Sequence, residues 1–418
     1  MLNNEYICAL DIGSSKIASC VARIRSGRIS DIFFDSLPAK DSQGGVIIDS
    51  IELVNHVTRL MKNLKAKSNI NIKSVYVGIS GQDIVTKHAR AVMPLAERGN
   101  KVITLIDLDK INEQARILGS SLEEEVLHQI PCGYSIDSKS DILNPIGLYS
   151  HRLEVDLYLV CAKLSTVQSL SRVINQSGFD AKGIFFSGLA SASAVFGEEL
   201  KTGLHILCDV GSDITELLIF REGVLSDIEI LPIGGNDLTA QLEETLQMPF
   251  DLAEEIKISY GVITDPALID DDKEILVKKS SIYKTIKQKF IAEIINPKAK
   301  SVCLAIKGVL EKKMRRHEVD SVTVCGRCGL LDGFIETLEN TLQMPVSLGR
   351  ITNPQILSLI KEERVFSGQK YLDYLVALGI ILQAQKEKPQ GALFFRQPAK
   401  NLILKAVNRF KDAYQEYF

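Results

Sequence analysis

The order of apolar and polar residues predicts strands and helices that alternate along most of the chain. Continuous or alternating apolar runs indicate strands, and apolar residues three or four apart indicate helices. The first eighty residues predict strands at 6–12, 17–24, 29–36 and 74–80 and a helix at 49–66. Later residues predict strands at 85–93, 153–161, 181–186 and 321–325, a strand-turn-strand at 206–220, and helices at 107–119, 165–176, 187–196, 251–261, 283–316 and 371–385.

Two predicted hairpins about two hundred residues apart carry the same motif. Each has an apolar run, then Asp-x-Gly with small polar residues, then a second β-prone run; the motifs contain Asp11 and Gly13, and Asp209 and Gly211. Glycine allows close backbone approach, the adjacent N–H and hydroxyl groups suit phosphate oxygens, and the carboxylate suits hydrated Mg²⁺. One such motif is usually only a turn, whereas the pair predicts two hairpins that hold one polyphosphate.

Two further motifs in the second half could complete a nucleotide site. Glu254 and Lys257 share a face of the predicted helix at 251–261, which Asp251 could cap, and could reach a ribose or an adenine edge. An ordinary surface ion pair explains the same spacing. The turn around Gly326 follows a predicted strand, and a helix that could start after it would face an adenosine or a phosphate with its N-terminus. Arg327 in this turn could stack on an adenine or block the pocket.

Two predicted helices are rich in small residues. They cover 187–196 and 371–385, and the second contains Ala377-Leu-Gly379. Small side chains let helix backbones approach closely, so we expect this pair to form a hinge between two lobes.

Length and charge restrict the class of protein. A chain of 418 residues with 45% hydrophobic content should divide into several subdomains. The net charge of -3 does not favour nucleic acid as a partner. With no signal-like start and no membrane-spanning apolar stretch, we expect a soluble intracellular protein. The eight cysteines are interpreted as free thiols, because Cys325-x-x-Cys328 lacks the second pair of a zinc motif.

The last residues predict an amphipathic helix at 401–418, after a linker at 386–400. Aromatic and apolar side chains share one stripe and cations lie nearby, a pattern that suits an anionic membrane surface. Packing of this helix on the protein core would explain the pattern equally well. The stripe consists of Ile403, Val407, Phe410, Tyr414 and Tyr417, with Lys405 and Arg409 beside it.

Taken together, these motifs resemble the FtsA family of bacterial cell-division proteins, within the actin and heat-shock-chaperone ATPase superfamily. The most specific segment is His128-Gln-Ile-Pro-Cys-Gly-Tyr-Ser-Ile-Asp137 in the region 83–163. The other segments are Ala9-Leu-Asp-Ile-Gly-Ser-Ser-Lys16, Val75-Tyr-Val-Gly-Ile-Ser-Gly81, Asn144-Pro-Ile-Gly-Leu148 with Arg152-Leu-Glu154, Gly234-Gly235 with Leu238-Thr239, and Ala253-Glu-Glu-Ile-Lys257.

The resemblance implies an α/β, actin-like two-lobed fold with a duplicated core, an inserted α+β subdomain and a C-terminal amphipathic helix. Residues 1–82 and 164–197 would form the first-lobe core, and 83–163 the insert. Residues 198–232 and 318–385 would form the second-lobe core, with 233–317 as its small subdomain. The linker and the membrane-targeting helix would follow at 386–400 and 401–418.

The resemblance also assigns site residues. ATP would bind between the lobes, with Mg²⁺ held through water by Asp11 and Asp209. Glu254 and Lys257 would hold the ribose or base, and Gly326 and Arg327 would flank the adenosine. The first phosphate loop would contain Gly13, Ser14, Ser15 and Lys16, and the second Gly211, Ser212, Asp213 and Thr215.

Two positions depart from the family pattern. Asp213 replaces a glycine of the second phosphate loop, so its carboxylate should disfavour a triphosphate unless Mg²⁺ intervenes. Arg327 replaces a glycine of the adenosine loop. A degenerate actin-fold protein that no longer binds nucleotide is therefore an alternative.

The function implied by the resemblance is structural. The chain would bind ATP, form head-to-tail filaments with itself, and tether FtsZ filaments to the cytoplasmic face of the inner membrane at midcell. It would hydrolyse ATP slowly at most, and its insert would dock other divisome proteins. FtsZ would contact the region of Ile294, Ile295 and Lys298, where Lys298 replaces an arginine and loses bidentate carboxylate recognition.

Two other functions are compatible with the same fold. One is a soluble PilM-like scaffold of pilus assembly, which would not need the terminal helix. The other is a sugar kinase or ATPase, for which the sequence identifies no catalytic carboxylate.

Overall fold

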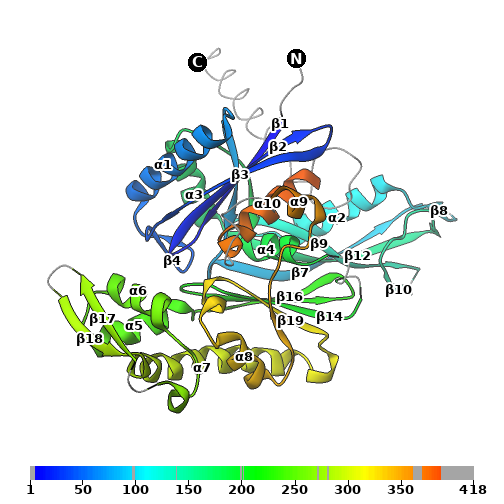
Figure 1. The fold of residues 1–418 in the computed structure, drawn as a ribbon. Helices are drawn as coiled ribbons and strands as arrows, with labels where there is room; N and C mark the ends of the chain where they lie inside the picture. Colours follow the sequence, from blue (N-terminus) through cyan, green and yellow to red (C-terminus); the bar gives the residue numbers. More distant parts are fainter. Residues whose placement is uncertain are drawn as a thin grey trace.

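Two five-stranded sheets with the same strand arrangement form the cores of two lobes (Figure 1). The computed structural model describes residues 5–96, 99–137, 139–197, 200, 202–270, 273–279, 282–360 and 370–386. In the first sheet the order is β3-β2-β1-β6-β13, and in the second it is β16-β15-β14-β19-β20. In each sheet the first three strands are antiparallel and the last two join in parallel, so the fold is a duplicated, actin-like one.

The first lobe is built on strands whose side chains are almost continuously buried, because helices cover both faces of the sheet. Helix α1 begins at the N-cap Asp49, whose carboxylate accepts the N–H groups of Ile51 and Glu52. The elements are β1 Glu5–Ile12, β2 Lys16–Arg25, β3 Arg28–Pro38, β4 Ser42–Gln43, β5 Val46–Ile47, α1 Ser50–Ser68, β6 Ser74–Ile79, α3 Leu164–Gln176, β13 Asp180–Phe186 and α4 Ser187–Val195.

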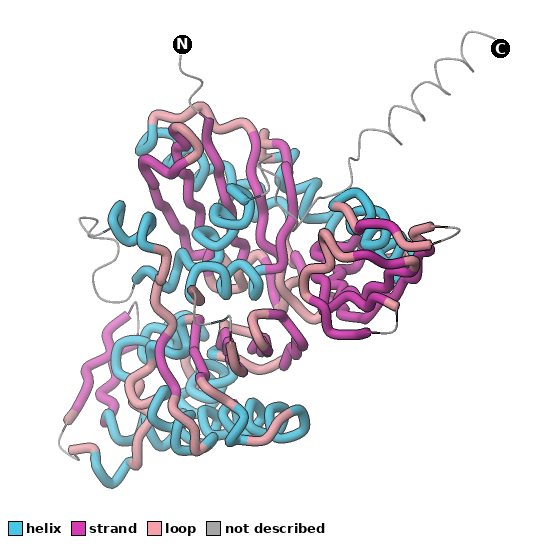
Figure 2. Tube along the Cα trace, turned by 90° about the vertical axis from the view of Figure 1, so that its right-hand side faces the viewer, coloured by secondary structure: helices cyan, strands magenta, loops and turns pink. Residues whose placement is uncertain are grey.

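The insert is a four-stranded antiparallel sheet, β10-β9-β12-β7, with α2 packed on it. Figure 2 shows it as a separate block of strands beside the lobes. The Tyr158 hydroxyl accepts the Ile228 N–H at 3.0 Å and so joins the insert to the second lobe. The elements are β7 Ile84–Pro94, β8 Lys101–Val102, α2 Leu105–Gly119, β9 Glu124–Ile136, β10 Lys139–Ile142, β11 Tyr149–Ser150 and β12 Arg152–Lys163.

The second lobe repeats the first sheet and adds a helical part with a short hairpin. Its apolar core is continuous from the sheet through α5, α6, α7 and α8. The elements are β14 Leu204–Val210, β15 Thr215–Arg221, β16 Val224–Leu231, α5 Gly235–Leu246, α6 Phe250–Tyr260, β17 Glu274–Lys279, β18 Ile282–Lys287, α7 Gln288–Lys313, β19 Ser321–Cys325, α8 Phe334–Leu342, β20 Val346–Leu348, α9 Pro354–Ile360 and α10 Leu375–Lys386.

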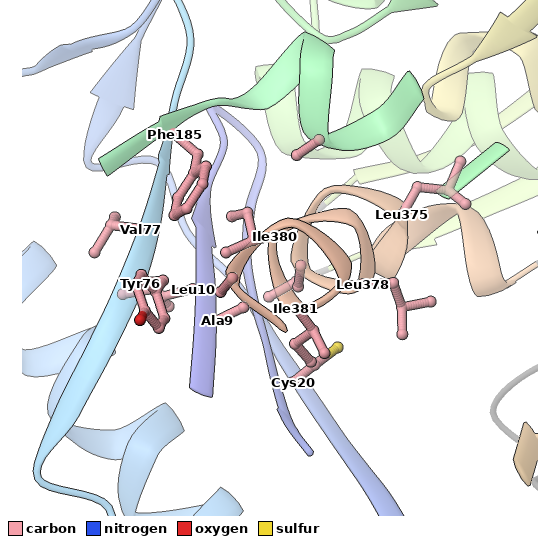
Figure 3. Close-up of a cluster of buried hydrophobic side chains, with 14 of the residues drawn as sticks. Ala9, Leu10, Cys20, Tyr76, Val77, Phe185, Leu375, Leu378, Ile380 and Ile381 are labelled. Atoms are coloured by element: carbon pink, nitrogen blue, oxygen red, sulfur yellow. The ribbon is translucent and has the colours of Figure 1, made fainter. Parts of the chain in front are cut away.

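Helices α4 and α10 lie against each other between the two sheets, as the sequence predicts for a hinge pair (Figure 1). Around α10, Leu378 and Ile381 lie near β1 and β2 (Figure 3). Gln383 donates to the Leu189 carbonyl at 3.0 Å and to the Ser193 hydroxyl at 2.8 Å. The small residues thus bring the two backbones close enough for direct side-chain hydrogen bonds.

Several predicted elements differ in extent from those observed. The region 283–316 begins as strand β18, and its helix starts only at Gln288. The segment after His128, for which the sequence predicts no strand, belongs to the 13-residue strand β9. Pro249, not Asp251, is the N-cap of α6, and Asp251 lies in its first turn. The predicted linker begins one residue early, since α10 includes Lys386. The predicted domain boundaries stay a prediction.

Candidate functional site

The two Asp-x-Gly motifs form equivalent turns at the same end of their sheets. The N–H of Gly13 donates to the Lys16 carbonyl at 3.0 Å, and the N–H of Gly211 donates to the Ile214 carbonyl at 2.9 Å. Both turns line one cleft between the lobes, so the duplicated motifs face a common space as predicted. The lining residues are Asp11, Ile12, Gly13, Ser14, Ser15, Lys16, Gly45, Ser80, Ser187, Ser191, Asp209, Gly211, Ser212, Asp213, Ile214, Glu216, Gly326, Arg327, Leu372, Leu375 and Val376.

Three carboxyl groups line the cleft: Asp11 and Glu216 are buried, and Asp209 is partly buried. Burial raises the pKa of Asp11, raises that of Asp209 to about 6, and raises that of Glu216 to about 8. The charges of Asp11 and Asp209 also raise the pKa of Glu216, which places the three groups within electrostatic reach of one another. A cation in the cleft would therefore be stabilised by these acids and would lower their pKa values.

Glu216 is a cleft residue that the motif analysis misses. It lies opposite Asp209 in the β14–β15 ladder, its side chain is buried, and Ser80 of the first lobe donates to it at 2.5 Å. The first hairpin has Ala18 opposite Asp11 at the corresponding place. The turn closed by Gly211 and Ile214 sets this register, so the spacing within the hairpin could have identified Glu216.

Hydrated Mg²⁺ fits this donor set better than a directly ligated metal does. Within the part of the chain that the structure describes, no group of three or more His, Cys, Asp or Glu side chains converges to ligate a metal. Mg²⁺ usually keeps several waters and takes one or two carboxylates. Asp11 and Asp209 both line the cleft and would hold such an ion through water, and Ser191 donates to Asp209 at 3.2 Å.

Two cations that line the cleft, Lys16 and Arg327, pair with Asp373. The Lys16 ammonium lies 3.7 Å from the Asp11 carboxylate and donates to the Asp373 carbonyl at 2.7 Å. The Arg327 guanidinium lies 3.5 Å from the Asp373 carboxylate and is 45% exposed. The pairing holds Arg327 in the cleft lining, where its side chain stays partly exposed to solvent.

Gly326 is required by the close packing of β14 and the turn that follows β19. Its φ is +82°, and a Cβ would lie 2.3 Å from the Val210 carbonyl oxygen and 2.7 Å from an Asp209 carboxylate oxygen. Any side chain at this position would displace Asp209 from the cleft.

Three predicted nucleotide residues do not line the cleft. The Thr215 hydroxyl is buried and donates to the Ile233 carbonyl at 2.8 Å. Lys257 is 5% exposed; its ammonium pairs with Glu254 at 2.6 Å and donates to the Gly235 carbonyl at 2.8 Å. Glu254 and Lys257 thus join α6 to the start of α5, which corresponds to the ordinary ion pair rather than to a ribose contact.

The residues predicted to contact FtsZ lie on α7. Ile294 is 8% exposed and Ile295 is fully buried, and both pack in the core of the second lobe. A partner therefore cannot contact these two side chains directly, and this part of the prediction is corrected. Lys298 is exposed on the same helix.

The predicted terminal helix lies outside the described residues, as do Ile403, Lys405, Val407, Arg409, Phe410, Tyr414 and Tyr417. Among the helices that are described, none is long and apolar enough to cross a membrane.

Comparison with known proteins finds two regions of the chain that are similar to known families. Residues 206–367 match the family model "Cell division protein FtsA", and residues 81–161 match the "SHS2 domain inserted in FTSA". The chain is 23% identical to the FtsA of Pseudomonas aeruginosa, covering 83% of each chain. It is also 23% identical to that of Borreliella burgdorferi, covering 93% of this chain and 92% of the relative.

Solved structures with the same fold share little sequence. A PilM-PilN type IV pilus biogenesis complex gives a TM-score of 0.63 at 15% identity, covering 91% of this chain and 98% of the other. MreB5 of Spiroplasma citri bound to ADP gives 0.50 at 11% identity, covering 88% and 98%. At such identities these structures show the actin-like fold alone.

Proposed function

Since this chain belongs to the FtsA family of cell-division proteins, we propose that it is an ATP-binding adaptor that tethers FtsZ filaments to the membrane. The observation that carries the nucleotide part is the pair of equivalent glycine turns facing one acidic cleft. An actin-like neighbour supports it further, since the structure of MreB5 of Spiroplasma citri was solved with ADP bound. The PilM likeness concerns the fold alone and favours no second function.

Different groups of the cleft would bind different parts of the nucleotide. The phosphates would accept hydrogen bonds from N–H and hydroxyl groups of the first loop, at Gly13, Ser14 and Ser15, and of the second loop, at Gly211 and Ser212. Lys16 would add positive charge. Asp11 and Asp209 would orient a hydrated Mg²⁺, which neutralises phosphate charge when it is bound.

Calorimetric titration with ATP, with and without Mg²⁺, tests this site. We expect the native chain to bind one Mg²⁺–ATP, and Asp209→Asn to weaken binding by roughly tenfold or more, because it removes a carboxylate that orients the metal. Asp180→Asn is a matched control, since Asp180 is exposed at the start of β13. Absence of binding by the native chain, or equal binding by native and Asp209→Asn protein, would contradict the proposal.

Membrane attachment is proposed for residues 401–418. The support is the amphipathic pattern of the segment, with cations beside an aromatic stripe. Attachment there would place the protein at the cytoplasmic face of the inner membrane, at midcell with the division machinery.

Co-sedimentation with vesicles containing anionic lipid tests the membrane segment. We expect the full chain to pellet and a chain ending at Gln397 to stay in the supernatant, because basic residues near such a surface contribute about 1 kcal/mol each. Lys405→Glu with Arg409→Glu should reduce pelleting while retaining the apolar stripe. Equal pelleting of the full and shortened chains would remove the membrane proposal.

The protein–protein part of the proposal comprises three contacts. The chain would join itself head to tail, dock other divisome proteins through residues 83–163, and bind FtsZ on the small part of the second lobe. Lys298 is exposed on α7 and available for the last contact. ATP hydrolysis, if the chain performs it, would be slow, in keeping with a structural adaptor.

A further inference from the structure

The carboxylate of Asp213 joins the two lobes across the cleft. One of its oxygens accepts the backbone N–H of Gly44 in the first lobe at 2.9 Å. The other accepts the side-chain amide of Asn236 in the second lobe at 2.7 Å. A single side chain of the second phosphate loop thus connects the two lobes, and its first-lobe partner Gly44 lies 169 residues before it in the chain.

The Gly44 donor is held firmly in place by the first lobe. It lies in the turn between β4 and β5, and the N–H of Gln82 donates to the Gly44 carbonyl at 3.4 Å. The next residue, Gly45, has φ +88°, and a Cβ there would lie 2.1 Å from the Ser80 carbonyl oxygen. The Ser42 hydroxyl donates to the Gly13 carbonyl at 3.1 Å, so the same turn is tied to the first phosphate loop.

The Asn236 donor is equally well fixed in the second lobe. It lies in the first turn of the 12-residue helix α5, and its N–H donates to the Ser212 carbonyl at 2.7 Å. A helix N-terminus with an adjacent amide and a backbone N–H from the opposite lobe is an arrangement that favours an anion. The anion present there is the carboxylate of Asp213.

The first phosphate loop has no such group. Ser15 follows Asp11 at the same spacing as Asp213 follows Asp209, so it is the equivalent residue of the first loop. Its carbonyl accepts the Ala39 N–H within the first lobe. Only the second loop therefore reaches across the cleft with a charged side chain at this position.

We infer that Asp213 is a built-in anion of the cleft, which takes the place of a nucleotide phosphate between Gly44 and Asn236 and holds the lobes closed without nucleotide. The claim that Asp213 takes the place of a phosphate rests on the proposed function. The claim that Asp213 holds the two lobes together does not depend on it. An incoming triphosphate would have to compete with this carboxylate for the same donors. Asp213 is thus a residue that sets both the resting angle of the lobes and the phosphate preference of the site.

Amide hydrogen exchange of the nucleotide-free full chain tests the closure directly. We expect the Gly44 N–H to be protected in the native protein and to exchange roughly tenfold faster or more in Asp213→Ser and Asp213→Asn, because the bond to a charged acceptor is lost. Asp251→Asn is the matched control: Asp251 also faces a first-lobe residue, Lys40, but both side chains are exposed, at 68% and 60%, so Gly44 protection should not change.

A second readout is the distance between spin labels on Lys62→Cys in α1 and Glu244→Cys in α5, two exposed positions on different lobes. We expect one narrow distance distribution in the native background and a broader or longer one with Asp213→Ser. A broad distribution in the native protein, or equal Gly44 exchange in native and Asp213→Ser chains, would overturn the inference.

Titration of the same chains with Mg²⁺–ATP separates this inference from the proposed function. Asp213→Ser should bind ATP more tightly than the native chain. If neither chain binds ATP while Gly44 exchange still depends on Asp213, the nucleotide proposal fails and the closure stands. Equal ATP affinity of the two chains would overturn the claim that Asp213 competes with a phosphate.

Discussion

Replacing Gly379 with alanine should destabilise the protein by about 3 kcal/mol or more, or prevent it from folding. A Cβ at Gly379 would lie 1.7 Å from the Ala190 carbonyl oxygen, and the other nearest atoms are also backbone atoms of Ala190. No flexible side chain can move aside, so helices α4 and α10 would have to separate. The hinge between the lobes depends on their contact, and its loss should unfold both cores.

Urea unfolding of Gly379→Ala, followed by circular dichroism, measures this effect, with Gly308→Ala as the matched control. Gly308 also lies within a helix, α7, but a Cβ there would meet nothing within 4 Å. We expect Gly308→Ala to stabilise the chain by roughly 0.5–1 kcal/mol, because alanine favours the helix and restricts the unfolded chain. Equal stability of Gly379→Ala and native protein would contradict the packing argument.

The same helix pair indicates which features the sequence can predict. Small residues around Ala190 and Gly379 are a local signal with one structural use, close helix approach, and that interpretation is confirmed. The two Asp-x-Gly hairpins are predictable for the same reason, because each turn is closed by bonds within a few residues. Their duplication predicts two hairpins that share one ligand, and the resemblance to the FtsA family implies the duplicated core.

Features that depend on contacts between distant segments are not predicted. Strand β9 contains Pro131 and Gly133, which normally argue against a strand. The pairing with β12 shifts register between these two residues, so that Cys132 is the extra residue of a β-bulge. Ile294 and Ile295 are buried because α7 packs against the rest of the second lobe, which no local pattern shows.

In the cleft, too, local features can be predicted and contacts between distant segments cannot. Its glycines, Asp11 and Asp209 can be assigned from the motifs, whereas one partner of Asp213 is a backbone N–H in the other lobe. Sequence reasoning predicts that a carboxylate stands where a phosphate would approach. Only the three-dimensional arrangement shows that the Asp213 oxygens accept hydrogen bonds from Gly44 and Asn236. The carboxylate that should disfavour a phosphate therefore forms a contact between the lobes.

A buried histidine should make the stability of the protein depend on pH between about 6.5 and 3. His128 on β9 is 2% exposed, and its Nε2 accepts the Phe186 N–H at 2.8 Å where β13 passes into α4. Burial lowers the pKa of His128 from 6.5 to about 3, so the ring stays neutral in the folded protein. The unfolded chain binds a proton below its ordinary pKa, and the folded chain does not.

Protonation therefore favours the unfolded chain as the pH falls. The contribution of His128 to the free energy of unfolding is fully present above pH 6.5 and is lost progressively towards pH 3, by up to about 5 kcal/mol.

His128→Gln keeps an acceptor for the Phe186 N–H but has no titratable group. Between pH 8 and pH 5, the free energy of unfolding of the native chain should therefore fall by about 2 kcal/mol more than that of His128→Gln. Urea unfolding at the two pH values measures the difference, and His317→Gln, at an exposed position, serves as the control. An identical pH dependence of the native and His128→Gln proteins would mean that the folded ring takes up its proton as readily as the ring of the unfolded chain, and the bond from Phe186 to Nε2 could not then persist at pH 5.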